Sequence, residues 1–493
     1  MKTAPPTVLC WFRRDLRLTD NPALCAALEE AQATGARLLP VFVWAPEEEA
    51  PWAPGAASRW WLHHSLAALS AELAARGAPL LIRRGPTLAT LQALAAETGA
   101  VALFWNRLYE PALICRDGEV KAALREAGLK VESHNGTLLA EPWTVKTGGG
   151  GPYRVFSPFW RSVSASLPAP EVLPAPATLP GLANAPDGLP LAALALLPRI
   201  AWDGGFYRAW SPGEQGALQR LDQWMGQGAG HYHEGRNWPA ADHTSRLSPH
   251  LHFGEISPRQ LRLRLQRELD GGRAGFAPEA EHYVRELGWR EFAHHLLFHY
   301  PHTPDRPLYE RFEAFPWRPA AEAAEDLAAW QRGATGVPIV DAGMRQLWGS
   351  GWMHNRVRMI VASFLTKNLL IPWQEGARWF WDTLVDASLA NNTLGWQWAA
   401  GCGADAAPYF RVFNPVLQSQ KFDGEARYLQ HWVPELAQLA PAACHAPWTA
   451  KAGQREAAGL RLGEHYPLPR VDLAASRDRA LAAYGALRGG ADG

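Results

Sequence analysis

Cysteine is scarce in this chain, and its placement argues against several kinds of site. The sequence has 493 residues and 5 cysteines, none of them in a CxxC pair. Scattered cysteines argue against a disulfide framework, a zinc site and a four-cysteine iron–sulfur cluster within the C-terminal half. We therefore predict no metal site, and a protein of a reducing compartment.

Long apolar runs are also missing. The N-terminus, MKTAPPTVLCWFRRD, reaches its charged residues before any long apolar stretch, so we expect no signal peptide. No segment approaches the roughly 20 consecutive apolar residues of a membrane helix. The formal net charge is +0 and the pI ≈ 7.3, which neither requires nor forbids a nucleic-acid partner, because a basic patch can exist within a neutral total. These features predict a soluble cytoplasmic protein without a membrane partner.

Tryptophan, in contrast, is abundant, with 24 copies in the chain. A bulky core would use most of them, and indoles can also stack on flat ligands or relay electrons. We therefore expect some of the tryptophans to have a function beyond packing.

The length predicts two or three domains. In residues 1–135, strand-like runs such as TVLCWF alternate with helix-like segments such as ALCAALEEA, which indicates an α/β domain with a parallel sheet. No GxGxxG follows the first run, so the usual dinucleotide turn is not expected. Residues 136–205 have the Gly-, Pro- and Ala-rich composition of a linker. Residues 206–480 show helical periodicity and are predicted to form an all-helical domain.

Hydroxyl groups gather in residues 232–261. Thr244, Ser245 and Ser248 precede an apolar, helix-compatible stretch, and hydroxyls with free backbone N–H groups at a helix start can bind a phosphate. Ordinary helix caps would give the same pattern. Ser257 is predicted to cap the helix that follows it.

Helical spacing in residues 282–292 brings four side chains to one face: Tyr283, Glu286, Trp289 and Arg290. Leu287 is expected to point away from that face. A surface of salt bridges is the alternative, but tryptophan and tyrosine are costly to leave in water.

Residues 351–365 show the same kind of spacing, which brings together Trp352, Asn355, Arg356 and Met359. A core helix with a stray asparagine is the alternative. The combination is typical of a pocket wall for a flat ligand with a polar edge and a nearby phosphate.

Residues 383–415 offer amides and tryptophans but few carboxylates. Asp386, Asn391 and Asn392 could bind the edge of a heteroaromatic ring. Trp396 and Trp398 are two residues apart, so on a helix they face different surroundings.

At these residues the chain resembles the photolyase/cryptochrome family. The similar stretches, in the family's order, are WFRRDLRLTDNPAL, TSRLSPHL, WREF, TGVPIVDAGMRQLWGSGWMHNRVRM, ANNTLGWQW and DAAPYFRVFNP. The resemblance extends over almost the whole chain. It implies a Rossmann-like α/β domain that can hold an antenna chromophore, and a larger all-helical domain that binds FAD.

The resemblance also implies the cofactor contacts. The matching positions are Tyr232, Thr244, Ser245, Leu247, Ser248, Arg290, Asn355, Arg358, Asp386 and Asn392. Arg358 and Asp386 would form an ion pair beside the isoalloxazine ring, and Asn392 would face its N5 edge. Asparagine at that position resembles photolyases, whereas plant cryptochromes typically carry aspartate. Ser388 stands where the family often has a second aspartate, so no flavin contact is carried over to it.

The chemistry that the resemblance implies is light-driven electron transfer. Excited reduced FAD gives an electron to a cyclobutane pyrimidine dimer in DNA, the ring splits and the electron returns. The positions that match the lesion pocket are Glu286, Trp289, Asn355, Met359 and Trp398. The family's tryptophan chain for photoreducing the flavin matches Trp396, Trp373 and Trp317. The positions that match contacts with the DNA backbone are Arg236, Arg356, Arg411 and Lys421.

The antenna is less well defined by the resemblance. Leu113 stands where some members have a glutamate that binds the folate. Methenyltetrahydrofolate at another site, a deazaflavin, or no antenna all stay open. The folate is favoured, because ANNTLGWQW and LHFGEISPR look closer to the branch nearest plant cryptochromes.

Three functions compete. The first is a monomeric photolyase that acts on double-stranded or single-stranded DNA in the bacterial cytoplasm, at the nucleoid. Asn392 and Met359 favour it, as does the end of the chain soon after the last helix-like segment. The second is a cryptochrome-type blue-light photoreceptor, which shares the fold and the flavin but often has a long C-terminal tail. The third is a non-catalytic binder of single strands that uses tryptophans as stacking platforms, which would need a broad basic groove.

Overall fold

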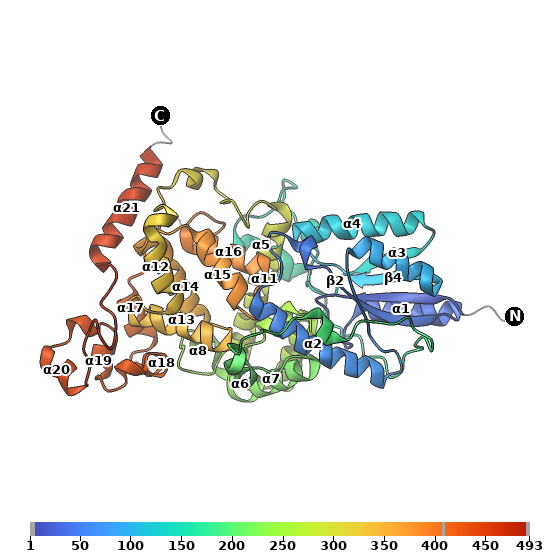
Figure 1. Ribbon diagram of the computed structural model, residues 1–493, viewed down its shortest axis with the longest axis horizontal. Coiled ribbons are helices and arrows are strands. Elements are labelled where there is room, and N and C mark those ends of the chain that lie inside the picture. Colours follow the sequence, from blue (N-terminus) through green and yellow to red (C-terminus); the bar gives the residue numbers. More distant parts are fainter. Residues whose placement is uncertain (1–4, 407–409, 490–493) are drawn as a thin grey trace.

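A parallel sheet with its covering helices lies at one end of the molecule, and a larger helical part lies at the other (Figure 1). The computed structural model describes residues 5–406 and 410–489. The sheet has 5 strands in the order β3-β2-β1-β4-β5, and all neighbours pair in parallel. The strands are β1 (Thr7–Phe12), β2 (Arg37–Trp44), β3 (Leu81–Arg84), β4 (Ala100–Asn106) and β5 (Lys130–His134). The predicted fold class, α/β followed by all-helical, is confirmed.

Alternation along the strands gives the sheet its two buried faces. On β1, Val8, Cys10 and Phe12 belong to one core, and Leu9 and Trp11 to the other. Helices α1 (Pro22–Thr34) and α2 (Ala56–Ala75) cover the first face. Helices α3 (Thr87–Thr98) and α4 (Pro111–Glu126) cover the second. Both faces are therefore apolar, as a parallel sheet with crossover helices requires.

Two predicted helix starts are confirmed at atomic detail. The side chain of Asn21 accepts the backbone N–H of Leu24, with Pro22 at the first helical position of α1. Ser257 and Gln260 form a reciprocal capping box at the start of α10. Both caps use neighbours in the sequence, which is why the sequence alone could predict them.

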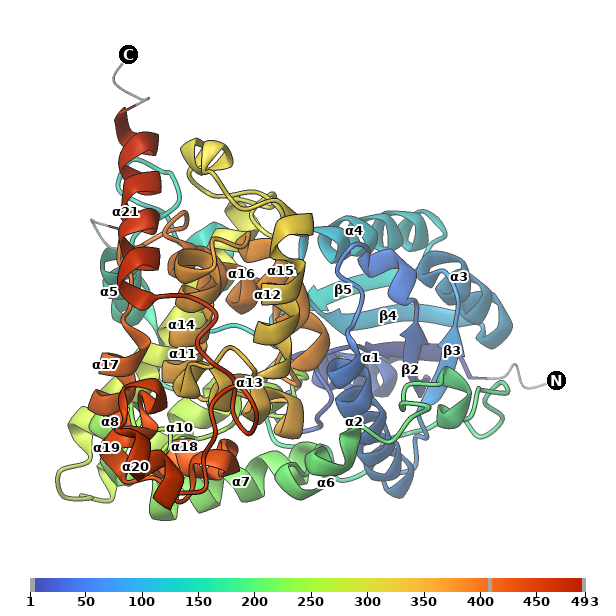
Figure 2. The same ribbon diagram turned by 60° about the vertical axis from the view of Figure 1, so that its left-hand side comes forward.

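The helical part surrounds a core that contains many of the tryptophans. Its shorter helices before α10 are α5 (Phe156–Ser166), α6 (Phe206–Ala209), α7 (Glu214–Gln227), α8 (Tyr232–Gly235) and α9 (Ser248–His252). The helices that build the core are α10 (Pro258–Asp270), α11 (Ala277–His299), α12 (Ala320–Arg332), α13 (Pro338–Ser350), α14 (Asn355–Ser363), α15 (Trp373–Thr383) and α16 (Leu389–Ala400). The last helices are α17 (Pro415–Phe422), α18 (Arg427–Trp432), α19 (Pro441–Cys444), α20 (Ala452–Ala457) and α21 (Leu473–Gly489), and Figure 2 shows α21 at the outer edge. Within the described ranges, no helix combines the length and apolar character needed to cross a bilayer.

The predicted linker is partly ordered. It contains α5, and the segment beyond α5 runs along the α/β part, where Leu179, Leu194 and Leu196 are buried against the sheet's core. The backbone of Leu38 in β2 donates to the carbonyl of Pro180 at 2.8 Å. The limits of a separate linker at residues 136 and 205 stay a prediction.

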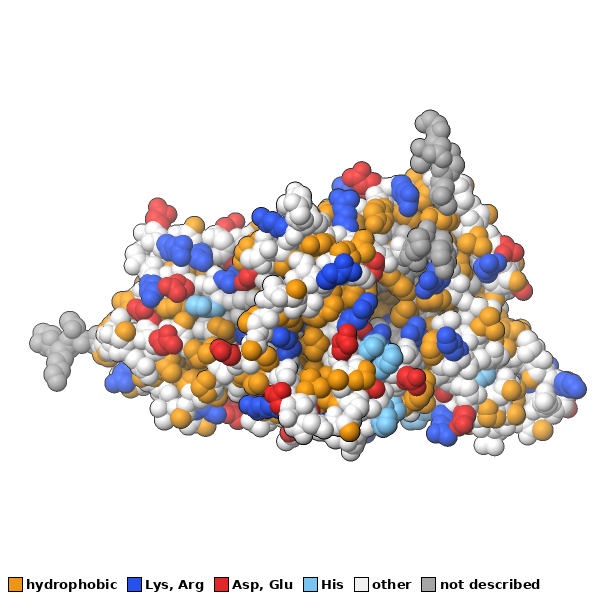
Figure 3. Space-filling model, turned by 180° about the vertical axis from the view of Figure 1, so that it is seen from behind, with side chains coloured by type: hydrophobic (Ala, Val, Ile, Leu, Met, Phe, Trp, Pro, Cys, Tyr) orange, Lys and Arg blue, Asp and Glu red, His pale blue; other side chains and the backbone are white. Residues whose placement is uncertain are grey.

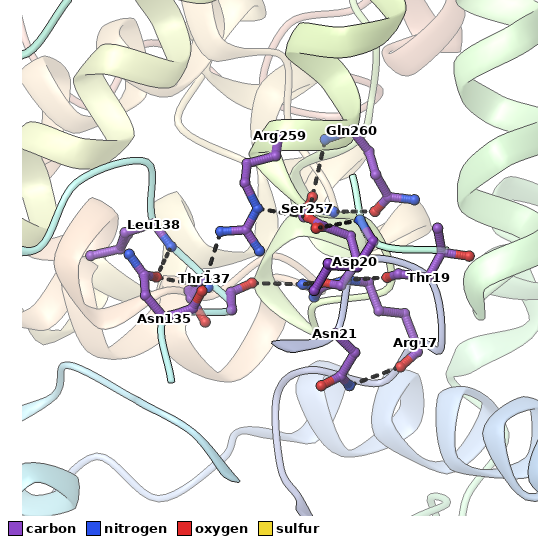
Figure 4. A network of polar contacts seen from close by, with 12 residues as sticks. Arg17, Thr19, Asp20, Asn21, Asn135, Thr137, Leu138, Ser257, Arg259 and Gln260 are labelled. Carbon is purple, nitrogen blue, oxygen red and sulfur yellow. Dashed lines mark hydrogen bonds and ion pairs between the residues drawn. The ribbon is translucent and has the colours of Figure 1, made fainter. Parts of the chain in front are cut away.

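A polar network joins the α/β part to the helical part (Figure 4). Asp20, after β1, accepts from the hydroxyl of Ser257 and from Nε of Arg259, the latter at 2.9 Å. Arg17 is buried and donates to the carbonyl of Gly254 at 2.9 Å. Most of the motif WFRRDLRLTDNPAL therefore fastens the two parts together, which fixes the helical part against the sheet.

Candidate functional site

An ion pair joins two predicted residues in the helical part. Arg358, on α14, donates from Nη2 to both carboxylate oxygens of Asp386, at 3.1 and 2.8 Å. The hydroxyl of Ser248, at the start of α9, donates to the same carboxylate at 2.6 Å. Residues far apart in the chain therefore meet where the sequence predicted one site.

The other two residues with predicted hydroxyl contacts, Thr244 and Ser245, lie a few positions before Ser248 in the chain. Oγ of Ser245 accepts from the hydroxyl of Tyr283 at 3.1 Å and from the backbone N–H of Leu247 at 3.3 Å. Arg220, which the sequence analysis did not single out, donates to the carbonyls of Thr244 and Ser245 at 2.9 and 2.8 Å. These contacts hold the backbone of the segment in place, and of its hydroxyl groups it is that of Ser248 that contacts Asp386.

Positive charge is concentrated around His354. The sequence analysis did not single out this histidine. Burial, and then the guanidinium groups of Arg356, Arg246, Arg358 and Arg236, lower the pKa of His354 to about 3. Its imidazole is therefore neutral. Nε2 of His354 and Nε of Arg356 are buried without a hydrogen-bond partner among the described residues, whereas Nε of Arg246 lies 3.3 Å from a carboxylate oxygen of Asp242. Such a group of donors suits a ligand that carries phosphates. Arg246 lies inside the motif TSRLSPHL, between the predicted hydroxyl residues Ser245 and Ser248.

Helix α14 begins later than the sequence predicted. Nδ1 of His354 accepts the backbone N–H of Arg356 at 3.2 Å and caps the helix, which starts at Asn355. Trp352 therefore lies before the helix and packs in the core around the sheet, with the guanidinium of Arg358 at 5.9 Å from its ring. Placing Trp352 on one helical face with Asn355, Arg356 and Met359 was wrong. Asn355 itself is exposed at the start of the helix.

On α11, Glu286 forms an ion pair with Arg236 of the segment after α8. The guanidinium of Arg236 also lies 6.0 Å from the ring of Tyr232. Tyr283 and Leu287 both belong to the core that α11 shares with α7 and α10, so the expectation that Leu287 points away from Tyr283 was wrong. The reason is that residues four apart on a helix lie on the same face.

The two remaining predicted residues of α11 lie in other surroundings. Arg290 donates to the carbonyl of Thr137 at 2.9 Å and lies 3.4 Å from the carboxylate of Glu291, at the seam with the α/β part. The described contacts therefore do not bring Arg290 to the ion pair of Arg358. Trp289 lies parallel to Phe156 of α5.

Helix α16 carries two predicted amides and two predicted tryptophans. Asn391 is exposed, and its amide donates to the hydroxyl of Ser388 at 3.1 Å. The side chain of Ser388 is therefore hydrogen-bonded to the first turn of α16. Asn392 donates to the carbonyl of Ala377 at 3.0 Å. Trp396 is buried and Trp398 partly buried, in different surroundings as predicted.

The three tryptophans predicted to form an electron relay are Trp396 on α16, Trp373 on α15 and Trp317 before α12. The indole of Trp396 lies against Gly376 of α15, where a Cβ atom would overlap the ring. Trp373 is buried and is the first residue of α15, about one turn before Gly376. Trp317 is partly buried, and its ring lies 4.4 Å from that of Phe315. Trp396 also meets Phe380 and Trp330, at 5.0 and 6.1 Å between ring centroids.

A cavity of about 190 Å³ lies beside Trp398. Arg411 and Lys367 also line it. Lys367 is buried, its ammonium lies 3.5 Å from the centroid of the Phe410 ring, and burial lowers its pKa to about 7. Residues 407–409 of the motif DAAPYFRVFNP lie outside the described residues.

Two predicted DNA contacts share one aromatic ring. The guanidinium of Arg356 and the ammonium of Lys421 lie 4.4 and 5.3 Å from the centroid of the Phe422 ring on α17. Arg356 is also near enough to Arg236 for the like charge to lower its pKa further, after burial. The face seen in Figure 3 is hollowed near its middle, with hydrophobic side chains in the hollow and Lys and Arg side chains beside it. Such a face suits a polyanion with flat bases.

The residues present fit FAD. The unpartnered Nε of Arg356 suits a phosphate, and the Ser248 hydroxyl and the Asp386 carboxylate offer partners to polar edges. The exposed amide of Asn355 is a further donor and acceptor. In the part of the chain that the structure describes, no cluster of three or more His, Cys, Asp or Glu side chains is arranged to hold a metal ion.

Comparisons with known proteins agree with this geometry. The family model "DNA photolyase" matches residues 8–178, and "FAD binding domain of DNA photolyase" matches residues 283–486. A deoxyribodipyrimidine photo-lyase of Agrobacterium fabrum (strain C58 / ATCC 33970) is 46% identical over 99% of both chains. Cryptochrome-2 of Arabidopsis thaliana is 39% identical, over 97% of this chain and 78% of that protein.

Solved structures give the same result. The crystal structure of a bacterial class III photolyase from Agrobacterium tumefaciens matches with a TM-score of 0.93 and 45% identity, over 99% of each chain. A Synechocystis cryptochrome matches with a TM-score of 0.87 and 30% identity, over 98% of this chain and 100% of that one. The chain therefore belongs to the photolyase/cryptochrome family, as its motifs predicted.

Proposed function

We propose that the protein is a deoxyribodipyrimidine photo-lyase, which uses blue light to repair cyclobutane pyrimidine dimers in DNA. One line of contacts carries the proposal. Glu286 pairs with Arg236, Arg236 lies near Arg356, and Nη1 of Arg356 lies 3.8 Å from the sulfur of Met359. These residues were predicted for the lesion and for the DNA backbone, and they come from three separate elements.

FAD would be held by the hydroxyl segment (residues 244–248, with Thr244, Ser245 and Ser248), by the arginines around His354 and by the ion pair of Arg358 with Asp386. When bound, reduced and excited, FAD supplies the electron that splits the dimer and takes it back. Asn392 is proposed to face the flavin's reactive edge, and its amide is oriented by the carbonyl of Ala377. The protein's task is to bind, orient and exclude water.

The side chains of the proposed lesion pocket have two roles. Trp289 and Trp398 offer flat faces to the joined pyrimidines, and each stacked base contributes about 1–3 kcal/mol. Glu286 is proposed to accept hydrogen bonds from the damaged bases, and in the free protein its carboxylate pairs with the guanidinium of Arg236. Photolyases take the damaged bases out of the helical stack, at a cost of roughly a few kcal/mol that a damaged pair lowers. Asn355 and Met359 complete the proposed wall.

Backbone phosphates would bind Arg236, Arg356, Arg411 and Lys421, so affinity for DNA depends on salt. We propose a monomer that accepts double-stranded or single-stranded DNA. Because its substrate is chromosomal, we place it in the bacterial cytoplasm, at the nucleoid.

For the antenna, we propose methenyltetrahydrofolate ahead of a deazaflavin. Planar ligands of parallel sheets usually bind at the carboxyl ends of the strands, where the strand order reverses. Here that point lies between β1 and β4, and Trp11 and Trp105 occupy it, with ring centroids 5.6 Å apart. The guanidinium of Arg13 covers Trp11 at 4.2 Å. A planar chromophore at this edge is therefore disfavoured, and an antenna would bind at another site.

The test is a spectrum and a repair assay. Purified protein should show flavin absorption and should restore a thymine-dimer oligonucleotide under blue light but not in the dark. Mass spectrometry of released chromophores identifies the antenna. Flavin without repair would support a cryptochrome-type photoreceptor, which the similarity to Cryptochrome-2 keeps as the second candidate. A protein without any chromophore would support the single-strand binder.

A further inference from the structure

Helix α5 lies in the segment that the sequence analysis described as linker, yet it packs against the proposed lesion wall. Phe156, its first residue, is buried, and its ring lies 3.8 Å from that of Trp289, with 8° between the planes. Among the described residues Phe292 meets Trp289 edge-on, at 6.0 Å, and the Phe156 ring is the one that stacks on it. Trp289 itself is only partly buried. An indole has two faces, so Phe156 takes one face and leaves the other for a ligand.

The position of α5 is fixed by two features of its neighbours. Gly288, next to Trp289 on α11, lies under the ring of Trp160, and a Cβ atom there would overlap that ring. The Trp160 ring is parallel to that of Phe156, with 6° between the planes and 6.5 Å between the centroids. The carboxylate of Asp405, in the segment after α16, lies close enough to the backbone of Phe156 at the start of α5 for that backbone to lower its pKa, although burial raises it more. Negative charge at a helix N-terminus is stabilising, so this carboxylate favours the first turn of α5.

We infer that Phe156 is a positioning residue for lesion recognition, which sets the plane of Trp289 without touching the DNA. Because Trp289 contacts a lesion only if the protein repairs dimers, this role rests on the proposed function. Two stacked rings are held in one orientation, whereas an indole beside an aliphatic side chain can rotate. Phe156 therefore contributes to the preference for damaged over intact DNA.

The variant Phe156→Leu keeps an apolar side chain but removes the stacked ring. The ratio of affinities for dimer-containing and intact oligonucleotides should fall about three- to tenfold, the range expected for one aromatic pair. Affinity for intact DNA and flavin content should stay near the wild-type values, because the arginine that lies over the Phe156 ring, at 5.2 Å, is Arg285 and not one of those proposed to bind DNA or flavin. Phe159→Leu is the matched control, since the Phe159 ring contacts Phe292 and His295 on the same helix pair.

A double-mutant cycle separates positioning from packing. Trp289→Ala alone should weaken binding of damaged DNA far more than of intact DNA. If Phe156 acts through Trp289, then Phe156→Leu should cost little further discrimination in the Trp289→Ala background. Should the leucine variant lose its flavin, Phe156→Met is used instead, because methionine fills irregular gaps in a core.

The outcomes are distinct. Coupled effects at positions 156 and 289, with Phe159→Leu unchanged, support the role of Phe156. An undiminished effect of Phe156→Leu in the Trp289→Ala background, or unchanged discrimination in the single variant, overturns it while leaving photolyase function intact. A wild-type protein that binds both oligonucleotides equally overturns the proposed function and the role of Phe156 together.

Discussion

Arg236 and Glu286 form an ion pair in the free protein, although the sequence predicted a different partner for each. Arg236 was expected to bind a DNA phosphate, and Glu286 the damaged bases. Substituting either residue should therefore separate two kinds of binding. The variant Arg236→Gln should bind damaged and intact DNA more weakly, by about the same factor. The slope of log affinity against log salt concentration should become smaller by about one. Titrations over a range of salt concentrations measure both quantities.

Glu286→Gln should have the opposite pattern. It removes a carboxylate acceptor from the proposed lesion pocket but leaves Arg236 free to bind phosphate. Binding of intact DNA should stay the same or become tighter, while the quantum yield of repair falls. A quantum yield equal to that of the wild type would remove Glu286 from the lesion pocket.

The pair of Arg358 with Asp386 should decide whether the flavin is retained. Asp386 has a side chain that is 4% exposed, and Asp386→Asn would leave the guanidinium of Arg358 without its anion. Breaking a buried pair by removing one partner typically costs about 3–5 kcal/mol, less where one member is partly exposed. Flavin content, measured as the ratio of flavin to protein absorbance, should fall strongly.

Asp326→Asn is the control for Asp386→Asn. Asp326, on α12, forms ion pairs with Arg318 and Arg470 at 2.8 and 2.7 Å. It is also a paired carboxylate, but it has no contact with the hydroxyl segment. Equal flavin loss in both variants would indicate general destabilisation and would contradict a specific role for Asp386.

Trp396→Phe should slow photoreduction of the flavin and spare repair by enzyme that is already reduced. Trp396 lies against α15, the helix that carries Trp373, as neighbours in the predicted relay should. Time-resolved absorption after blue-light excitation measures the rate. Trp381→Phe changes another core tryptophan, whose N–H donates to the carbonyl of Ala53 at 2.7 Å, and should leave the rate unchanged. Equal rates in the wild type and in Trp396→Phe would exclude Trp396 from the relay.

His354 should make stability depend on pH. Its pKa is lowered to about 3 by burial and then by surrounding arginines, whereas an unfolded histidine titrates near 6.5. Between these values the unfolded chain binds a proton that the folded protein does not, so stability is full above pH ~6.5 and falls as the pH falls toward 3. The slope should approach about 1.4 kcal/mol per pH unit for one proton.

The variant His354→Asn isolates that contribution. Asparagine can still cap α14 but does not titrate in this range. Melting temperatures of wild type and variant between about pH 4 and pH 7 should diverge, with the wild type losing more stability on the acidic side. Parallel curves would show that protonation of His354 in the unfolded state does not drive the change.

Much of the site was predictable because its signals are local or fixed by the family's motifs. Helix caps at Asn21 and Ser257 depend on neighbours in the sequence, and both are confirmed. The ion pair of Arg358 with Asp386 followed from the resemblance, since the motif positions carry over one by one. The false start predicted for α14 has a local cause too, because His354 replaced the usual small polar cap and was not recognised as one.

The sequence by itself determined the parallel sheet, the helical second part and the family, because periodicity, caps and motif order are written along the chain. Only the tertiary structure decided which predicted residues hold one another: Arg236 with Glu286, and Phe156 with Trp289. These partners come from separate elements, and their contact depends on how helices pack rather than on spacing in the chain. A segment with linker composition therefore became part of the proposed lesion wall, since Gly288 lets α5 approach α11 closely enough for the two rings to stack.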